Sequence, residues 1–178
     1  MIVAWYYKNI MKYMIAAHDR DRAIGKNGEI PWAKLLPADM QRFRDLTMGG
    51  SVIMGRKTYE SLPERYRPLP GRQNIVLSMG RLAGAGFQVA HSLDEAYAIA
   101  EHEQVHIIGG GQIYDLAMDS VDQINITEVD TLVNDPDAHF PAVDSMQWHE
   151  TERETFAADE KNAFGYSFVT YLRNHPIV

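Results

Sequence analysis

Short apolar runs that end at glycine or charged residues recur along the chain, and they predict buried β-strands. The expected strands of this kind lie at residues 13–17, 51–54, 74–78, 87–90 and 105–108. Residues 123–129 alternate between apolar and polar side chains, which predicts a half-buried strand. Two longer strands, joined by a polar segment, are expected at 148–156 and 165–172.

Apolar residues spaced three and four positions apart predict helices between these strands. One helix is expected from Pro37, because proline suits a first helical turn. Its apolar stripe is formed by Leu36, Met40, Phe43 and either Leu46 or Thr47. Further helices are expected after Gly55, at the capping box that begins with Ser92, and after Gly111.

The order of these elements predicts the class of fold. Helices that alternate with strands imply parallel crossovers, whereas the last two strands imply an antiparallel hairpin. We therefore expect a single α/β domain with a mixed, mostly parallel central sheet of about eight strands, helices on both faces and a C-terminal antiparallel hairpin.

Asp39 falls on the apolar stripe of the first predicted helix, one position before Met40 and four before Phe43. Its carboxylate should therefore face apolar surroundings, where an acid is costly without a polar partner. The alternative is that an acid in a first helical turn only complements the helix dipole. The helix by itself does not decide between the two.

Length and composition indicate one ordinary globular domain: 178 residues, 46% apolar and 23% charged. The chain has no cysteine, which excludes disulfides and thiolate chemistry and fits a cytoplasmic protein. A net charge of −7 argues against general binding to nucleic acid or to an anionic membrane. Residues 1–12 do not read as a signal peptide, so we expect an N-terminal extension there and the domain at 13–178.

Several glycines and polar residues come directly after predicted strands, where open α/β sheets bind ligands. They are residues 55–58, Ser78 and residues 109–111. Basic side chains gather in one stretch of this acidic chain, at Arg56, Lys57, Arg65, Arg67 and Arg72. Together they predict a small ligand with several negative charges, the alternative being a solvated basic surface.

Three motifs match only by letters. Residues 102–106 read H-E-x-x-H, but a strand is expected to begin at Val105, so the two histidines would not share a helix face and no metal site is expected. Residues 50–55 have P-loop glycine spacing without the following Lys-Ser/Thr. Residues 109–114 lack the last glycine of a Rossmann fingerprint.

Taken together, the order and spacing of several stretches resemble dihydrofolate reductase over about residues 13–173. The stretches that carry the resemblance are 15–17, 24–25, 31–32, 36–39, Phe43, 52–61, 67–72, Asn74, Ser78, 108–111, Tyr114, Thr127 and 137–141. The resemblance implies reduction of 7,8-dihydrofolate to tetrahydrofolate by hydride transfer from NADPH, which supports one-carbon metabolism. It also implies antifolates as inhibitors, and we expect a monomer.

The resemblance implies a role for three residues at the reaction centre. Asp39 would bind the 2-amino group and ring N–H of the pterin and favour its protonation, with the proton arriving through water. Thr127 would hydrogen-bond Asp39 from the opposite side. Trp32 would orient an ordered water, and residues 23–35, with Gly25 and Gly28, would form a loop that closes over nicotinamide.

The remaining implied residues divide between the two ligands. The pterin and benzoate would contact Ile15, Ala16, Ile30, Met40, Phe43, Leu62, Leu69, Ile108 and Tyr114, and the glutamate tail would contact Arg67 and Arg72. The cofactor would contact Ala17, Ile24, Gly25, Gly55, Arg56, Lys57, Thr58, Ser78, Met79, His91, Gly109, Gly110, Gly111, Gln112, Ile113 and Tyr114. In the family a cis peptide joins the first two of the three glycines.

The chain departs from the family pattern at several of these positions. Lys34 and Leu35 look like a small insertion, and Met79 and Gln112 stand where a hydroxyl and a basic residue can occur, which affects 2′-phosphate discrimination. Two other kinds of protein share part of the pattern. A pyrimidine reductase of riboflavin synthesis generally lacks the pair Pro31-Trp32 and the helix Asp39, and a non-catalytic nucleotide-binding module would leave Asp39 without a purpose.

Overall fold

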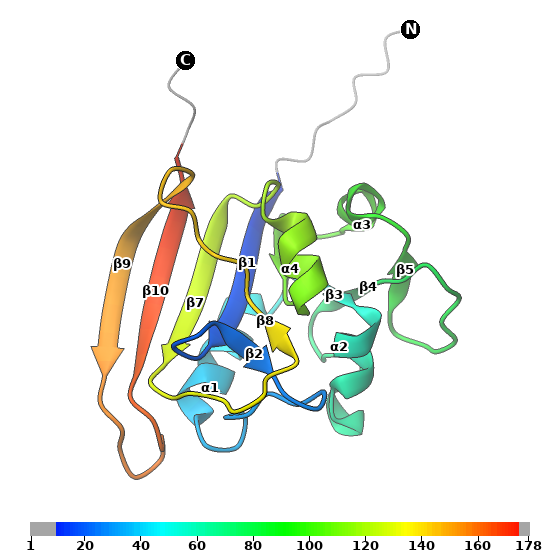
Figure 1. Ribbon diagram of the computed structural model, residues 1–178. Helices are drawn as coiled ribbons and strands as arrows, with labels where there is room; N and C mark the ends of the chain where they lie inside the picture. Colours follow the sequence, from blue (N-terminus) through cyan, green and yellow to red (C-terminus); the bar gives the residue numbers. More distant parts are fainter. Residues whose placement is uncertain (1–9, 175–178) are drawn as a thin grey trace, which may run out of the picture.

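The computed structural model describes residues 10–174 and has at its centre an eight-stranded sheet with the order β5-β4-β3-β6-β1-β7-β10-β9 (Figure 1). The strands are β1 (Met11–His18), β3 (Ser51–Gly55), β4 (Gln73–Leu77), β5 (Gln88–Ala90), β6 (Gln104–Ile107), β7 (Gln123–Val129), β9 (Trp148–Phe156) and β10 (Tyr166–Arg173). Each strand bound lies within about one residue of the bound expected from the hydrophobic pattern, except that β1 begins about two residues earlier.

Six of the strands are parallel and two close one edge in the opposite sense. β1 pairs in parallel with β6 and β7, and β3 pairs in parallel with β4 and β6. β10 runs antiparallel to both β7 and β9, which makes the C-terminal hairpin. The mixed, mostly parallel sheet predicted from the sequence is therefore confirmed.

Within residues 10–174, four helices cover the two faces of this sheet: α1 (Pro37–Thr47), α2 (Arg56–Ser61), α3 (Leu93–Ile99) and α4 (Gly111–Ala117), with a 3-10 turn η1 (Glu64–Tyr66) after α2. Leu93 of α3 and Ala117 of α4 pack with Ile124 and Ile126 in the largest core cluster. Phe43 of α1 and Tyr59 of α2 pack on Val52 from the other face. Alternation along each strand thus supplies apolar side chains to both layers.

A small two-stranded sheet, β2 (Ala23–Gly25) with β8 (Ala138–His139), was not predicted. Two and three residues are too few for a periodic pattern, and the pairing joins segments more than a hundred positions apart. In Figure 1 this pair lies in front of the central sheet, beside α4 and above α1.

The start of the domain differs from expectation, and the segment after β1 contains a buried acid. Residues 1–9 of the expected extension 1–12 lie outside the described residues, but β1 already begins at Met11. One of the charged residues that follow β1 is buried, since Asp19 is only 1% exposed. Its carboxylate accepts backbone N–H groups from Asp21, Ala23 and Val133, which offset the cost of burying it.

The H-E-x-x-H segment does not form a helix. α3 ends at Ile99 and His106 lies within β6, as the sequence indicated. Within residues 10–174 there is no group of three or more His, Asp or Glu side chains placed to hold a metal ion. In the same part of the chain, the structure contains no helix with the length and apolar character needed to cross a bilayer.

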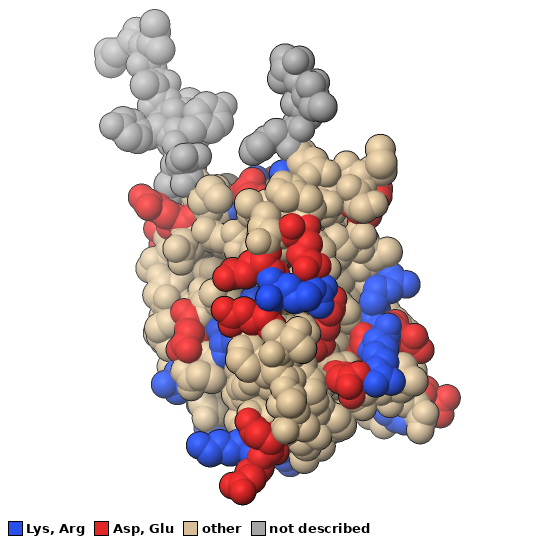
Figure 2. Space-filling model, turned by 90° about the vertical axis from the view of Figure 1, so that its left-hand side faces the viewer, with Lys and Arg blue, Asp and Glu red and all other residues tan. Residues whose placement is uncertain are grey.

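The side of the molecule that carries β9 presents acidic and basic side chains next to one another (Figure 2). Residues 149–156 of this edge strand are exposed. The Arg153 guanidinium forms ion pairs with Glu128 at 2.5 Å and with Glu150 at 2.8 Å. Charged side chains on an edge strand discourage pairing with a second chain.

Candidate active site

The carboxyl ends of the parallel strands meet at one edge of the sheet, and most of the predicted site residues follow them there. Ala17 is the residue before the last of β1, Gly55 ends β3, Ser78 follows β4, His91 follows β5 and Ile108 follows β6. The turns are tied together, since Gly55 N–H donates to the Gly109 carbonyl at 2.7 Å and Ser78 N–H to the Ala90 carbonyl at 3.0 Å.

Asp39 is buried on the inner side of α1, with 6% of its surface exposed, as its place on the apolar stripe predicted. The Thr127 hydroxyl of β7 hydrogen-bonds to its carboxylate and lowers the pKa, as does the nearby positive charge of Arg42. Burial outweighs both effects and raises the pKa of Asp39 to about 6. The polar partner that the sequence argument required is Thr127.

Arg42 was not predicted as part of this site. It lies three positions after Asp39 on α1, and its Nη1 donates to the Ile126 carbonyl at 3.1 Å. Its guanidinium lies over the Phe168 ring, 4.5 Å from the ring centroid. The available signal in the sequence was the three-residue spacing from Asp39, which places both side chains on neighbouring positions of a helix.

Trp32 is 1% exposed and packs with Leu36, Val129 and Tyr166. The indole Nε1 is buried and has no hydrogen-bond partner among the described residues. Buried donors are normally paired, so this N–H has the capacity to bind a small polar molecule. Trp32 is both a core residue and a candidate donor.

The predicted closing loop, residues 23–35, is held against the segment between β7 and β8. Asp137 N–H donates to the Gly25 carbonyl at 3.1 Å, and Asn27 N–H donates to the Asp137 carboxylate at 2.6 Å. The Lys26 ammonium also bonds to the Asn134 carbonyl. Gly28 has a φ of 75°, which suits the tight turn at the tip of the loop.

The structure brings together four of the apolar residues predicted for the substrate: Phe43, Leu62, Leu69 and Ile108 form one cluster. Ile15 is buried and Met40 is half-buried, whereas Ile30 in the loop is 45% exposed.

Ala16 differs from these residues in the direction of its side chain. It packs in the main core with Tyr114, on the face of the sheet opposite Asp39, because neighbouring residues of a strand point to opposite faces. Ala17 instead pairs with Thr127 in register and packs near Ala38 of α1.

The two arginines predicted for the tail of the substrate lie close to the apolar cluster. Arg72 Nη1 donates to the Thr47 hydroxyl at 2.9 Å, and the guanidinium lies 5.7 Å from the centroid of the Phe43 ring. Burial lowers the pKa of Arg72 from its ordinary value, with a further small effect from Arg44. Arg67 is exposed and donates to the Glu60 carbonyl at 2.8 Å.

The glycine run after β6 is closely surrounded. The Gly109–Gly110 peptide is cis, as the resemblance implied. A Cβ on Gly111 would lie 2.9 Å from the His139 carbonyl oxygen, and one on Gly110 would lie 3.2 Å from the Thr58 hydroxyl. Gly109 has a φ of 108°, a conformation that favours glycine. Side chains are thus excluded from this turn, which leaves its backbone open to close approach by a ligand.

Three further side chains pack around this turn or bond to the neighbouring strand. Tyr114 of α4 is buried, and its hydroxyl donates to the Ile15 carbonyl at 2.7 Å. Burial raises the pKa of Tyr114, with a smaller contribution from the charge of Asp39. Ile113 packs beside Gly55, and the Ile24 side chain lies near Gly111.

The basic and polar residues predicted for the cofactor line the same edge and are accessible. Arg56 and Lys57 are exposed at the start of α2, and Arg56 Nε bonds to Glu60 at 2.7 Å. His91 Nδ1 lies 2.7 Å from the Ser78 carbonyl oxygen. Met79 is 89% exposed, and Gln112 is exposed at the start of α4.

Comparisons with known proteins agree with this geometry. The family model for dihydrofolate reductase matches residues 11–173. A dihydrofolate reductase type 3 of Salmonella typhimurium is 44% identical over 162 residues, which cover 90% of this chain and 96% of that protein. A dihydrofolate reductase of Mycobacterium tuberculosis is 38% identical over 164 residues, which cover 90% and 97%.

A solved structure gives the same result. The dihydrofolate reductase of Enterococcus faecalis, complexed with NADP(H) and RAB-propyl, has a TM-score of 0.83 and 31% identity, over 93% of this chain and 97% of that one. The expectation of a reductase is confirmed over the pyrimidine reductase and the non-catalytic nucleotide-binding module. The chain belongs to the dihydrofolate reductase family and catalyses the NADPH-dependent reduction of 7,8-dihydrofolate.

Proposed function

We propose that Asp39 is the residue that binds the pterin ring of dihydrofolate and supports its protonation. A carboxylate buried at the carboxyl edge of the sheet attracts a ring that can present an amino group and a ring N–H. Its negative charge favours protonation of the bound ring, so it acts as an electrostatic anchor. Thr127 holds the carboxylate from β7 in the orientation needed for two parallel hydrogen bonds.

Trp32 and the loop 23–35 have supporting roles in the same proposal. The unpaired indole N–H of Trp32 would hold a water molecule that delivers the proton. The loop, joined to Asp137 through Gly25 and Asn27, would cover the reaction centre and exclude bulk solvent. Excluding solvent strengthens the interaction between Asp39 and the ring.

We assign the cofactor to the edge formed by the glycine run and the start of α2. NADPH supplies the hydride when bound. The backbone of Gly109, Gly110 and Gly111 would approach the pyrophosphate, and backbone groups of Ala17 and Ile24 would hold the carboxamide of nicotinamide. The residues expected around the 2′-phosphate and the adenosine are Arg56, Lys57, Thr58, Ser78, Met79, His91 and Gln112.

The observation that carries the assignment of Asp39 is its burial on α1 together with the hydrogen bond to Thr127. Asp39→Asn keeps the shape of the side chain and removes its charge. We expect the variant to fold and to lose at least about a hundredfold in kcat at neutral pH. Near-normal turnover would refute the role.

The measurement is the fall in NADPH absorbance with dihydrofolate, and circular dichroism checks the fold. Asp45→Asn is the matched control, because Asp45 lies on the same helix but is exposed and bonds only to Gln41 at 2.7 Å among the contacts found within residues 10–174. We expect the control to retain the activity of the unmodified enzyme.

Preference for NADPH over NADH tests the cofactor assignment. Arg56→Ala removes an exposed positive charge at the start of α2 and should raise KM for NADPH far more than KM for NADH. An Arg56→Ala variant with an unchanged preference would count against the assignment. Because Met79 and Gln112 offer no charge, the preference should depend strongly on Arg56 and Lys57.

The same proposal includes three properties that follow less directly from the site. A planar inhibitor with adjacent amino groups should compete with dihydrofolate for Asp39, so we expect inhibition by antifolates. The charged β9 edge supports a monomer, and the cysteine-free composition agrees with a cytoplasmic location. Sedimentation and inhibition assays test the first two directly.

A further inference from the structure

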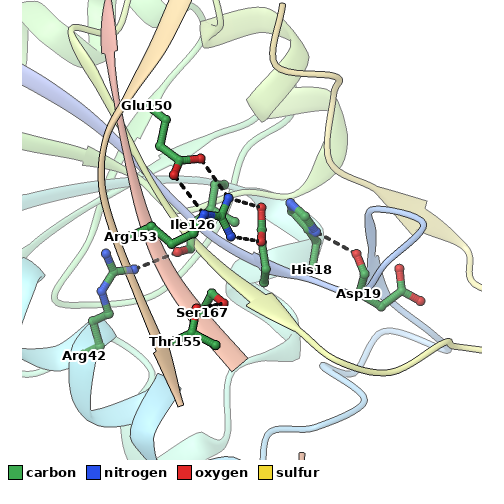
Figure 3. Close-up of polar contacts among 9 residues, drawn as sticks. His18, Asp19, Arg42, Ile126, Glu150, Arg153, Thr155 and Ser167 are labelled. Atoms are coloured by element: carbon green, nitrogen blue, oxygen red, sulfur yellow. Dashed lines mark hydrogen bonds and ion pairs between the residues drawn. The ribbon is translucent and has the colours of Figure 1, made fainter. Parts of the chain in front are cut away.

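Arg42 occupies an unusual position beside the reaction centre. It is half-buried between α1 and the sheet, one helical turn after Asp39. Figure 3 shows its side chain reaching from α1 toward β7, where a dashed line joins it to the Ile126 carbonyl. A guanidinium that is half-buried must be paired or stacked, and Arg42 is both.

The carbonyl that Arg42 binds belongs to the peptide that leads into Thr127. Thr127 is the residue whose hydroxyl bonds to Asp39. One side chain of α1 therefore accepts a hydrogen bond from Thr127, while another donates to the peptide directly before it. Together the two contacts fix α1 to β7 at the point where the site is built.

The guanidinium also lies over the Phe168 ring of β10, 4.5 Å from the ring centroid. A planar guanidinium over an aromatic face is a favourable arrangement that an ammonium group reproduces less well. Arg42 thus has one contact with β7 and one with β10, and both hold its positive charge near Asp39.

The charged and titratable groups around this pair are few. Asp39 faces Arg42 on its own helix, Thr127 on β7 and the neutral Tyr114. Arg42 faces Asp39 and, from β9, the carboxylates Glu152 and Glu154. Burial lowers the pKa of Arg42 and the three acids raise it, so it remains a cation.

We propose that Arg42 is a positioning residue of the reductase: it holds Thr127 and Asp39 together, and its fixed positive charge keeps Asp39 ionised. The part of this inference that concerns catalysis rests on the proposed role of Asp39, whereas the part that concerns ionisation does not. Arg42 itself need not touch either ligand.

The ionisation of Asp39 can be measured in the ligand-free enzyme. Carbon-13 NMR of aspartate-labelled protein follows each carboxyl group, and the Asp39 signal is the one lost in Asp39→Asn. Arg42→Gln should raise the titration midpoint of Asp39 by about one pH unit. Arg42→Met removes the same charge while it keeps apolar packing on Phe168, so it provides a second charge-free variant.

Two further variants separate charge from general damage. Lys161→Gln removes one positive charge from an exposed position of the β9–β10 connection and should leave the midpoint unchanged. Arg42→Lys should restore the midpoint, because it restores the charge. It should still raise KM for dihydrofolate, because it loses the planar stack on Phe168 and weakens the contact with Ile126.

An unchanged midpoint in both Arg42→Gln and Arg42→Met would overturn the proposal, as would an equal shift in Lys161→Gln. This titration needs neither substrate nor cofactor. If Asp39→Asn kept its turnover, the role of Asp39 in catalysis would fail while the measured effect of Arg42 on its ionisation would stand.

Discussion

The Asp19 carboxylate accepts the backbone N–H of Val133 at 2.8 Å, although the two residues are 114 positions apart in the chain. Its other oxygen accepts the N–H groups of Asp21 at 2.9 Å and Ala23 at 2.8 Å. The carbonyl of Asp19 also lies 2.7 Å from His18 Nδ1 (Figure 3). One buried carboxylate therefore joins the end of β1, the start of β2 and the segment between β7 and β8.

Asp19→Asn should break this link selectively. The amide oxygen can still accept the N–H groups of Asp21 and Ala23, but the amide nitrogen cannot accept the N–H of Val133. We expect a loss of about 1–3 kcal/mol in the free energy of unfolding and faster hydrogen exchange at Val133. We also expect weaker NADPH binding, because Ile24 follows directly on this turn.

Urea unfolding, amide exchange and NADPH titration measure these three effects. Asp21→Asn is the matched control, because Asp21 lies two residues after Asp19 in the chain but its side chain is exposed. If both variants changed stability, amide exchange and NADPH binding equally, the hydrogen bond between Asp19 and Val133 would not be what holds the turn after β1.

The layout of the fold could be predicted from the sequence because each long strand carries its own pattern. A hairpin is expected at residues 148–156 and 165–172, and the observed strands are β9 (Trp148–Phe156) and β10 (Tyr166–Arg173). The pairing of β2 with β8 could not be predicted, because it depends on contacts between Ala23 and His139 that local periodicity does not encode.

In the candidate site too, local sequence pattern predicted some features, whereas others depend on contacts between distant parts of the chain. The burial of Asp39 followed from helix periodicity, and the resemblance supplied Thr127 as its partner. Arg42 and Asp19 were missed because charged side chains are expected on the surface. Their burial depends on backbone groups of Ile126 and Val133, which only the folded chain brings near.

Tyr114→Phe should destabilise the enzyme through the loss of one buried hydrogen bond. The pairing of β1 with β6 ends at Met14 and Ile107, and the Tyr114 hydroxyl donates to the next carbonyl, that of Ile15, at 2.7 Å. Removing the hydroxyl takes this hydrogen bond from a buried carbonyl, which costs about 1–3 kcal/mol. The melting temperature should fall by roughly 2–4 °C per kcal/mol in a domain of this size.

Tyr97→Phe is the control for this prediction. Its hydroxyl bonds to Ser120 at 2.7 Å in a half-buried place, where water can replace the lost partner. Differential scanning calorimetry should show the larger fall in melting temperature for Tyr114→Phe. Equal falls in melting temperature would mean that the hydrogen bond from Tyr114 to the Ile15 carbonyl contributes no more to stability than the half-buried bond of Tyr97.

His106 is a buried histidine outside the predicted site. It is 3% exposed, its ring stacks on Tyr13 with the centroids 5.1 Å apart, and neither ring nitrogen has a hydrogen-bond partner among the described residues. A Cβ on Gly50 would lie 2.9 Å from its Cδ2, so the ring fills its space closely. Burial lowers the pKa of His106 to about 4.

This lowered pKa makes part of the stability depend on pH. The unfolded chain binds a proton at a pKa of about 6.5, so the contribution of His106 is full above that pH and is lost as the pH falls toward 4. The loss should reach roughly 2–3 kcal/mol. Asp39 acts in the opposite sense, because its raised pKa favours the folded state as the pH falls below about 6.

Only a difference between variants separates the two effects. His106→Met replaces the imidazole by an apolar side chain of similar size and removes its proton-binding site. The free energy of unfolding in urea is measured from neutral pH down to about pH 4.5. As the pH falls, the variant should become more stable relative to the unmodified enzyme. His149→Met, at an exposed position of β9, controls for the loss of a histidine. If the difference between His106→Met and the unmodified enzyme stayed constant across this range, His106 would not be the group that the folded state keeps unprotonated.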